Sequence, residues 1–139
     1  MSRRPDDLHL LVRPLFDRFL QLAEAEGIDV LVTCTWRSPA EQAALYAQGR
    51  TAPGKVVTRA KPGQSMHNHC VQGHPASLAF DVVPLRHGKP VWAAKDPLWL
   101  EVGRLGEEAG LEWAGRWKSF REYPHFQHPE AARLRGASA

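Results

Sequence analysis

The stretch that most constrains the fold of this chain runs from residue 28 to residue 49 and reads IDVLVTCTWRSPAEQAALYAQG. Its first part, Ile28 to Thr35, is short, apolar and rich in β-branched residues, which predicts a buried strand. The tetrapeptide Ser38-Pro39-Ala40-Glu41 then has the composition of a capping box with proline at the first helical position. We therefore expect a strand, a short polar connection and a helix that ends at Gly49.

The segment before this stretch is predicted to form an amphipathic helix. Its apolar residues recur at helical spacing, at Leu11, Leu15, Phe19 and Leu22. Pro14 is tolerated only in a first turn, so the helix should begin near Leu11, and Gly27 should end it. Residues 50 to 64, which follow the capped helix, are rich in proline and glycine and read as a long ordered loop. Loops of this length are usually functional or disordered.

A second strand is predicted over Leu78 to Leu85, with a turn and an edge strand after it. A further helix should begin with Asp96 as its N-cap and bury Trp99, Val102, Leu105 and Ala109. Two short strands, near residues 111–113 and 123–128, complete the pattern. Helices and strands do not alternate regularly, so the class is α+β. The 139 residues should form one domain, with a frayed tail from about residue 129.

The composition narrows the possible partners without selecting one. The net charge is +3 and the pI is about 9.1, which suits an anionic partner such as a cell-wall polymer or a nucleic acid. The basic residues are scattered, however, so no nucleic-acid arm is predicted. The N-terminus has no continuous apolar segment, and we find no membrane span. We expect a soluble chain made in the cytoplasm without a signal peptide.

Four residues suggest a catalytic metal site. His67, Asp81 and His125 supply two imidazoles and a carboxylate, and Glu122 adds a second carboxylate three residues before the last imidazole. Two His and one Asp can hold a zinc ion and leave its fourth position open, although Mn²⁺ or Co²⁺ would also suit these ligands. Asp81 lies in an apolar strand, where a lone carboxylate is costly to bury unless it is paired or metal-bound.

The cysteines suggest no disulfide framework. Cys34 lies in an apolar run, where core packing is expected, and Cys70 lies in a His-rich loop, where an unpaired thiol is expected.

These motifs resemble those of a known family. Ser65-x-His67, Ala79-x-Asp81 and Glu122-x-Pro124-His125 are similar to the zinc-binding motifs of the D-alanyl-D-alanine carboxypeptidase superfamily, peptidase family M15. Within it, the sequence is most similar to the L-alanyl-D-glutamate endopeptidases of phage endolysins, over roughly residues 28 to 128. The resemblance implies a small antiparallel sheet flanked by helices, in the zinc fold that hedgehog and D-Ala-D-Ala peptidases share.

The chain departs from the family pattern between its first two zinc motifs. The pattern S-x-H-x-x-G-x-A-x-D places the ligands seven residues apart, whereas His67 and Asp81 are fourteen apart (81 minus 67). Either His67 is the ligand and residues 69–76 are an insertion, or His74 is the ligand, since it precedes Asp81 by seven residues. We favour His67, because the six residues from 63 to 68 match the preceding block. His69 and His74 are then expected in an exposed loop.

The resemblance also implies roles for other residues. Glu122 stands where the family has a general base, which would take a proton from water and pass it to the leaving amine. Arg37 corresponds to an active-site arginine that stabilises the oxyanion or a substrate carboxylate. Ser65 is a weaker candidate for orienting a ligand from the second layer around the metal. Gln42 is a polar candidate without a defined role.

The implied function is that of a zinc peptidase, with one Zn²⁺ per chain, that cleaves the L-alanyl-D-glutamate bond in peptidoglycan stem peptides during phage or prophage lysis. We expect a monomer that binds neither nucleic acid nor membranes, and that acts on the cell wall or periplasm after release from the host cytoplasm. A D-alanyl-D-alanine carboxypeptidase or dipeptidase with the same zinc site is the main alternative. A metal nuclease, suggested by the basic pI and the run His67-Asn68-His69, and a non-catalytic wall-binding zinc module are further alternatives.

Overall fold

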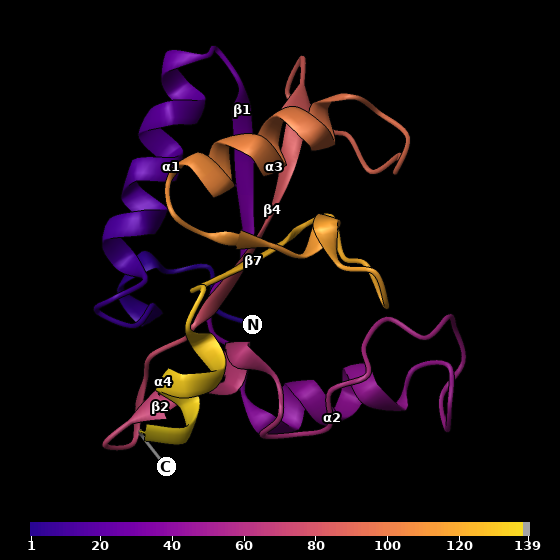
Figure 1. Ribbon diagram of the computed structural model, residues 1–139. Coiled ribbons are helices and arrows are strands. Elements are labelled where there is room, and N and C mark those ends of the chain that lie inside the picture. Colours follow the sequence, from indigo (N-terminus) through magenta and orange to yellow (C-terminus); the bar gives the residue numbers. More distant parts are fainter. Residues whose placement is uncertain (138–139) are drawn as a thin grey trace.

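A five-stranded antiparallel sheet organises the computed structural model, which describes residues 1–137 (Figure 1). Its strands are β1 (Asp29–Cys34), β4 (Ala79–Arg86), β5 (Lys89–Pro90), β6 (Glu112–Trp113) and β7 (His125–Gln127). The order is β1-β4-β7-β6, and β5 pairs with β4 as an edge hairpin. The α+β class and the small antiparallel sheet are confirmed.

The hydrophobic core lies between one face of the sheet and two helices, α1 (Arg13–Ala25) and α3 (Leu98–Glu108), which lie together in Figure 1. Phe80 of β4 stacks on Phe126 of β7 with ring centroids 5.6 Å apart, and Phe19 of α1 packs against both. Strand side chains alternate between the two faces of a sheet. Residues 81 and 125, next to these two phenylalanines, therefore point away from the core.

The remaining elements before residue 131 are one helix, one two-stranded hairpin and three 3-10 turns. Helix α2 (Pro39–Ala47) begins with the expected capping box, because Ser38 Oγ accepts from the Glu41 amide and the Glu41 side chain accepts from the Ser38 amide. The short 3-10 helix η2 (Met66–Asn68) follows the long loop, and the hairpin of β2 (Cys70–Val71) and β3 (His74–Pro75) follows η2. Two further 3-10 turns are η1 (Pro5–Asp7) and η3 (Ala114–Arg116).

The prediction of a frayed tail from residue 129 is wrong for most of that segment. Residues Ala131–Ala137 form helix α4, and Ala131 and Leu134 are buried in the core cluster. A helix this short is marginal by itself, and packing of one apolar side stabilises it. Residues 138–139 lie outside the described part of the chain. Among the helices of residues 1–137, none is both long and apolar enough to cross a membrane.

Candidate active site

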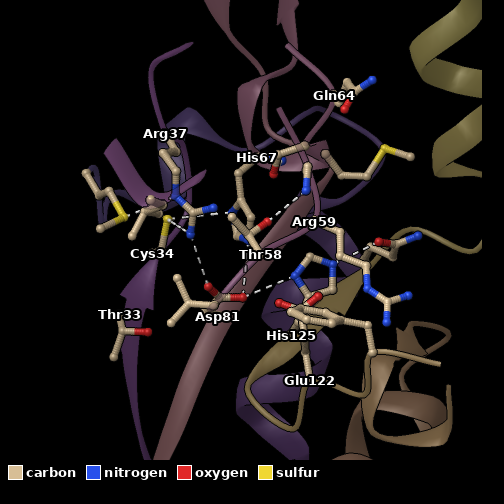
Figure 2. A pocket seen from close by; sticks show the side chains of 18 of the residues that line it. Thr33, Cys34, Arg37, Thr58, Arg59, Gln64, His67, Asp81, Glu122 and His125 are labelled. Atoms are coloured by element: carbon tan, nitrogen blue, oxygen red, sulfur yellow. Dashed lines mark hydrogen bonds and ion pairs between the residues drawn. The ribbon is translucent and has the colours of Figure 1, made fainter. Parts of the chain in front are cut away.

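Strand register brings the first two site residues together. Asp81 pairs with His125 across β4 and β7, and both side chains lie on the sheet face opposite the Phe80–Phe126 stack. As a result, Asp81 Oδ1 lies 3.3 Å from His125 Nδ1 (Figure 2). The immediate neighbours Phe80 and Val82 belong to the core face, whereas the Asp81 carboxylate lines a cavity.

His67 joins this pair from η2. Ser65 caps η2, and its hydroxyl accepts a hydrogen bond from the His67 amide at 3.2 Å. The His67 carbonyl accepts from the Arg37 amide, which ties η2 to the end of β1. His67 Nε2 then lies 3.2 Å from the same Asp81 oxygen that faces His125. Ser65 therefore supports His67 through the backbone.

Hydrogen bonds on the far side of each imidazole fix which nitrogen faces the centre. His67 Nδ1 donates to the Thr35 carbonyl at 2.9 Å, which leaves the Nε2 lone pair directed at Asp81. His125 Nε2 donates to Gln127 Oε1 at 2.8 Å, which leaves the Nδ1 lone pair directed at Asp81. Two nitrogen lone pairs and one carboxylate oxygen thus converge on the same small volume.

The electrostatics of this cluster favour positive charge beside Asp81. Burial disfavours charge on Asp81, but the two histidines outweigh it and hold its pKa well below the usual value. Burial likewise opposes charge on His67, yet Asp81 and, less strongly, Cys34 raise its pKa to about 10. The carboxylate therefore stabilises positive charge at the point that both imidazole nitrogens face. A divalent cation at that point would supply this charge, so His67, Asp81 and His125 fit a zinc ion with an open position.

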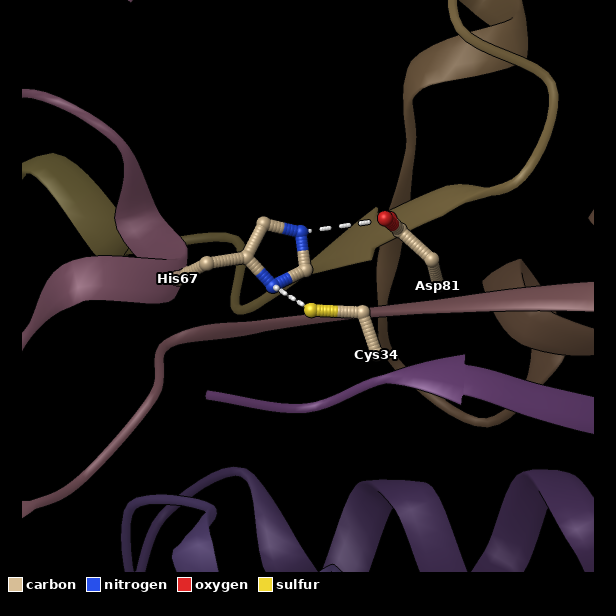
Figure 3. A group of neighbouring side chains, drawn as sticks. All are labelled: Cys34, His67 and Asp81. Carbon is tan, nitrogen blue, oxygen red and sulfur yellow. Dashed lines mark hydrogen bonds and ion pairs between the residues drawn. The ribbon is translucent and has the colours of Figure 1, made fainter. Parts of the chain in front are cut away.

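Cys34, for which core packing was expected, lies beside this cluster. It is buried, but its Sγ lies 3.6 Å from His67 Nδ1, within a tight group with His67 and Asp81 (Figure 3). The register slips by one residue between Val32 and Cys34, so that Cys34 rather than Thr33 pairs with Asp81. A bulge of this kind turns a side chain to the other face. Cys34 contacts His67 Nδ1, the same nitrogen that donates to the Thr35 carbonyl. The thiol therefore lies on the side of the imidazole away from the nitrogen that faces Asp81.

Arg37 is fixed beside Asp81 by Gln42. The Arg37 guanidinium lies 3.5 Å from Asp81 Oδ2 and donates to Gln42 Oε1 at 2.9 Å. Gln42 is fully buried, and its amide donates in turn to the Ala60 carbonyl at 2.8 Å. The side chain that had no defined role in the sequence therefore links Arg37 to the long loop of residues 50–64.

Glu122 lines the same cavity without joining the cluster. Burial raises the pKa of its carboxyl above the ordinary value of 4.5, with His125 opposing this shift. Across residues 1–137, no Lys, Arg or His nitrogen lies within ion-pair distance of its carboxylate. Glu122 therefore presents a partly desolvated carboxylate, which is a better proton acceptor than an exposed one.

The cavity that holds these residues measures about 710 Å³. Beyond the residues already described, its walls include Arg59 from the long loop, Phe120 from the segment before β7, and the indoles of Trp92 and Trp117. A cleft of this size can take several residues of a peptide.

A chain of polar contacts extends outward from His125 and was not expected from the sequence. Gln127, which accepts from His125, donates to Glu112 Oε2 at 3.4 Å. The Trp117 indole N–H donates to the same Glu112 oxygen at 3.0 Å. His125 and Gln127 share a face because they are two residues apart in β7, and this alternation is the one sequence signal for the contact.

The insertion forms the β2–β3 hairpin and lies outside the cluster. His74 is exposed on that hairpin, so the structure groups His67, and not His74, with Asp81 and His125. The expectation that His69 is also exposed is wrong: His69 is buried, and its Nδ1 lies 2.9 Å from the Ala76 carbonyl. The hairpin closes over this residue because residues 69 and 76 flank its two strands.

The chain is similar to several known proteins. Two family models described as D-alanyl-D-alanine carboxypeptidase match residues 58–128 and residues 6–84. The peptidoglycan L-alanyl-D-glutamate endopeptidase CwlK of Bacillus subtilis is 37% identical over 131 residues, which cover 88% of this chain and 74% of that protein. The crystal structure of the Serratia marcescens L-Ala D-Glu endopeptidase ChiX superposes with a TM-score of 0.62 at 20% identity, covering 93% of this chain and 86% of that one. This last match shows a common fold.

Proposed function

Because this chain belongs to the D-alanyl-D-alanine carboxypeptidase family of metallopeptidases, we propose that it is a zinc-dependent endopeptidase that cuts the L-alanyl-D-glutamate bond of peptidoglycan stem peptides. The observation that carries the proposal is the convergence of His67, Asp81 and His125 in a cavity that Glu122 also lines. The choice of bond rests on the similarity to the Bacillus endopeptidase. A zinc ion held by the three residues would act as a Lewis acid and lower the pKa of a bound water.

The protein's own side chains supply the other parts of the reaction. Glu122, with its pKa raised by burial, accepts a proton from the attacking water and delivers it to the leaving amine. The Arg37 guanidinium, oriented by Gln42 and close to Asp81, offers N–H donors to negative charge that develops on the carbonyl oxygen. Both side chains line the cavity, so they need no large rearrangement to meet a bound peptide.

The test is a digestion of purified peptidoglycan followed by mass analysis of the fragments. The proposal expects new amino-terminal D-glutamate and carboxyl-terminal L-alanine, lost on chelation and restored by zinc. The Glu122→Gln variant is the control, because it should keep zinc and fold while losing turnover. Products without a new D-glutamate amino terminus would refute the proposed bond.

A D-alanyl-D-alanine carboxypeptidase or dipeptidase is the second candidate, because both matching family models carry that description. The same digestion separates the two functions, since this activity would release free D-alanine or its dipeptide. The nuclease interpretation is not retained, because the matching families are peptidases.

We also propose that the protein acts on the cell wall as a phage- or prophage-type lytic enzyme. The support is the peptidoglycan substrate of the Bacillus relative. Expression in a bacterial cytoplasm should then lyse cells only when the membrane is permeabilised. Lysis that is equal with and without permeabilisation would contradict this setting.

A further inference from the structure

Arg59 lines the active-site cavity. It belongs to the long loop of residues 50–64, yet its Nη1 donates to Ser119 Oγ at 2.9 Å and its guanidinium lies over the Phe120 ring, 4.8 Å from the centroid. Both partners belong to the segment that leads to Glu122. Figure 2 shows the Arg59 side chain near the His125 imidazole, and Glu122 lines the same cavity.

The charge of Arg59 is not balanced by the protein. Arg37, in the same cavity, pairs with Asp81, whereas Arg59 has no carboxylate within 4.0 Å in the described part of the chain. Its contacts are a neutral hydroxyl and an aromatic face, which orient the guanidinium without neutralising it. Most of its N–H donors therefore stay free to bind an anion that enters the cavity.

We propose that Arg59 binds a carboxylate of the substrate and thereby selects stem peptides whose D-glutamate is not amidated. This inference rests on the proposed function. A glutamate whose amine lies in the scissile bond has two carboxyl groups, and the peptide continues through only one of them. The other is a free carboxylate on the residue that carries the leaving amine, so it must lie in the same cavity as Glu122. A guanidinium matches a carboxylate in shape and charge, whereas the corresponding carboxamide is neutral.

The experiment compares two synthetic peptides that differ in one group. One is N-acetyl-L-alanyl-D-glutamyl-L-lysine, linked through the glutamate side chain, and the other carries the α-carboxamide instead of the α-carboxylate. We expect the zinc-loaded wild-type enzyme to prefer the acid peptide by about 10-fold or more in kcat/KM, the scale of one charge-assisted hydrogen bond. Arg59→Gln should reduce this ratio to near one by slowing the acid peptide alone, and Arg59→Lys should restore part of it.

A matched control removes the same charge from the same loop. Lys61 lies two residues further on and does not line the cavity, so Lys61→Gln should keep the preference. Equal cleavage of both peptides by the wild type would overturn the inference. An Arg59→Gln variant that slows both peptides alike, with or without a lower Tm, would also overturn it. That result would mean that Arg59 only connects the long loop to Ser119 and Phe120. If the wild type cuts neither peptide but releases D-alanine from a D-alanyl-D-alanine peptide, the proposed function itself fails.

Discussion

Substitution of Gln127 by Met tests whether the outer contacts of His125 tune metal binding. Gln127 Oε1 accepts the hydrogen bond from His125 Nε2, at 2.8 Å. Methionine has a similar length and volume but offers no comparable acceptor, so packing is largely kept while the imidazole N–H loses its partner. His125 is largely buried, so water does not readily replace that partner.

The size of the effect follows from these contacts. Removing such a partner of a metal-binding histidine typically costs about 10- to 100-fold in metal affinity, which equals roughly 1.4–2.8 kcal/mol. We therefore expect Gln127→Met to weaken zinc binding by about 10- to 100-fold. The turnover at saturating zinc should fall less, because Arg37 keeps its contact with Gln42 and Glu122 still lines the cavity.

The assay is a competition for zinc between the protein and a chromogenic chelator, with thermal unfolding measured on the same samples. The control is the double variant Glu112→Gln with Gln127→Glu, which exchanges the carboxylate and the carboxamide. Position 127 then still accepts the hydrogen bond from His125, and an amide N–H still connects positions 112 and 127. The double variant should retain most of the affinity. Wild-type zinc affinity in Gln127→Met would refute the reasoning, as would an equal loss in the double variant.

Three further substitutions test the site and the core. Glu122→Gln should keep zinc and Tm but reduce kcat by about 100-fold or more, measured by peptide hydrolysis; loss of zinc would make Glu122 a ligand instead. Arg37→Ala should lower kcat by about 10²–10³-fold, and Arg37→Lys should recover part of it; near-normal turnover in Arg37→Ala would remove Arg37 from the site. Gly106→Ala should destabilise the fold by about 1–3 kcal/mol in urea unfolding, because a Cβ there would lie 2.2 Å from the Phe126 ring. The exposed position Leu100→Ala, in the same helix, should show little change.

Local sequence was sufficient for the strands of the large sheet, for helices α1, α2 and α3, and for the orientation of the strand residues. The capping box of α2, the proline in the first turn of α1 and the buried face of α3 were predicted and are present. Alternation in β4 and β7 already places Asp81 and His125 on the face of the sheet that Phe80 and Phe126 do not occupy. These features depend on hydrogen bonds and side-chain directions among near neighbours in the chain, so neighbouring residues are enough to specify them.

Tertiary structure alone decided which distant groups meet. The bulge in β1 turned Cys34 toward His67, and packing against the core ordered α4, where the sequence predicted a tail. The contacts of Gln42 with Arg37, of Gln127 with His125 and of Arg59 with Ser119 likewise follow from strand register and loop closure. Residues far apart in sequence meet only when the whole set of pairings and packed faces is formed, because the short pattern around each of them permits several registers and several partners.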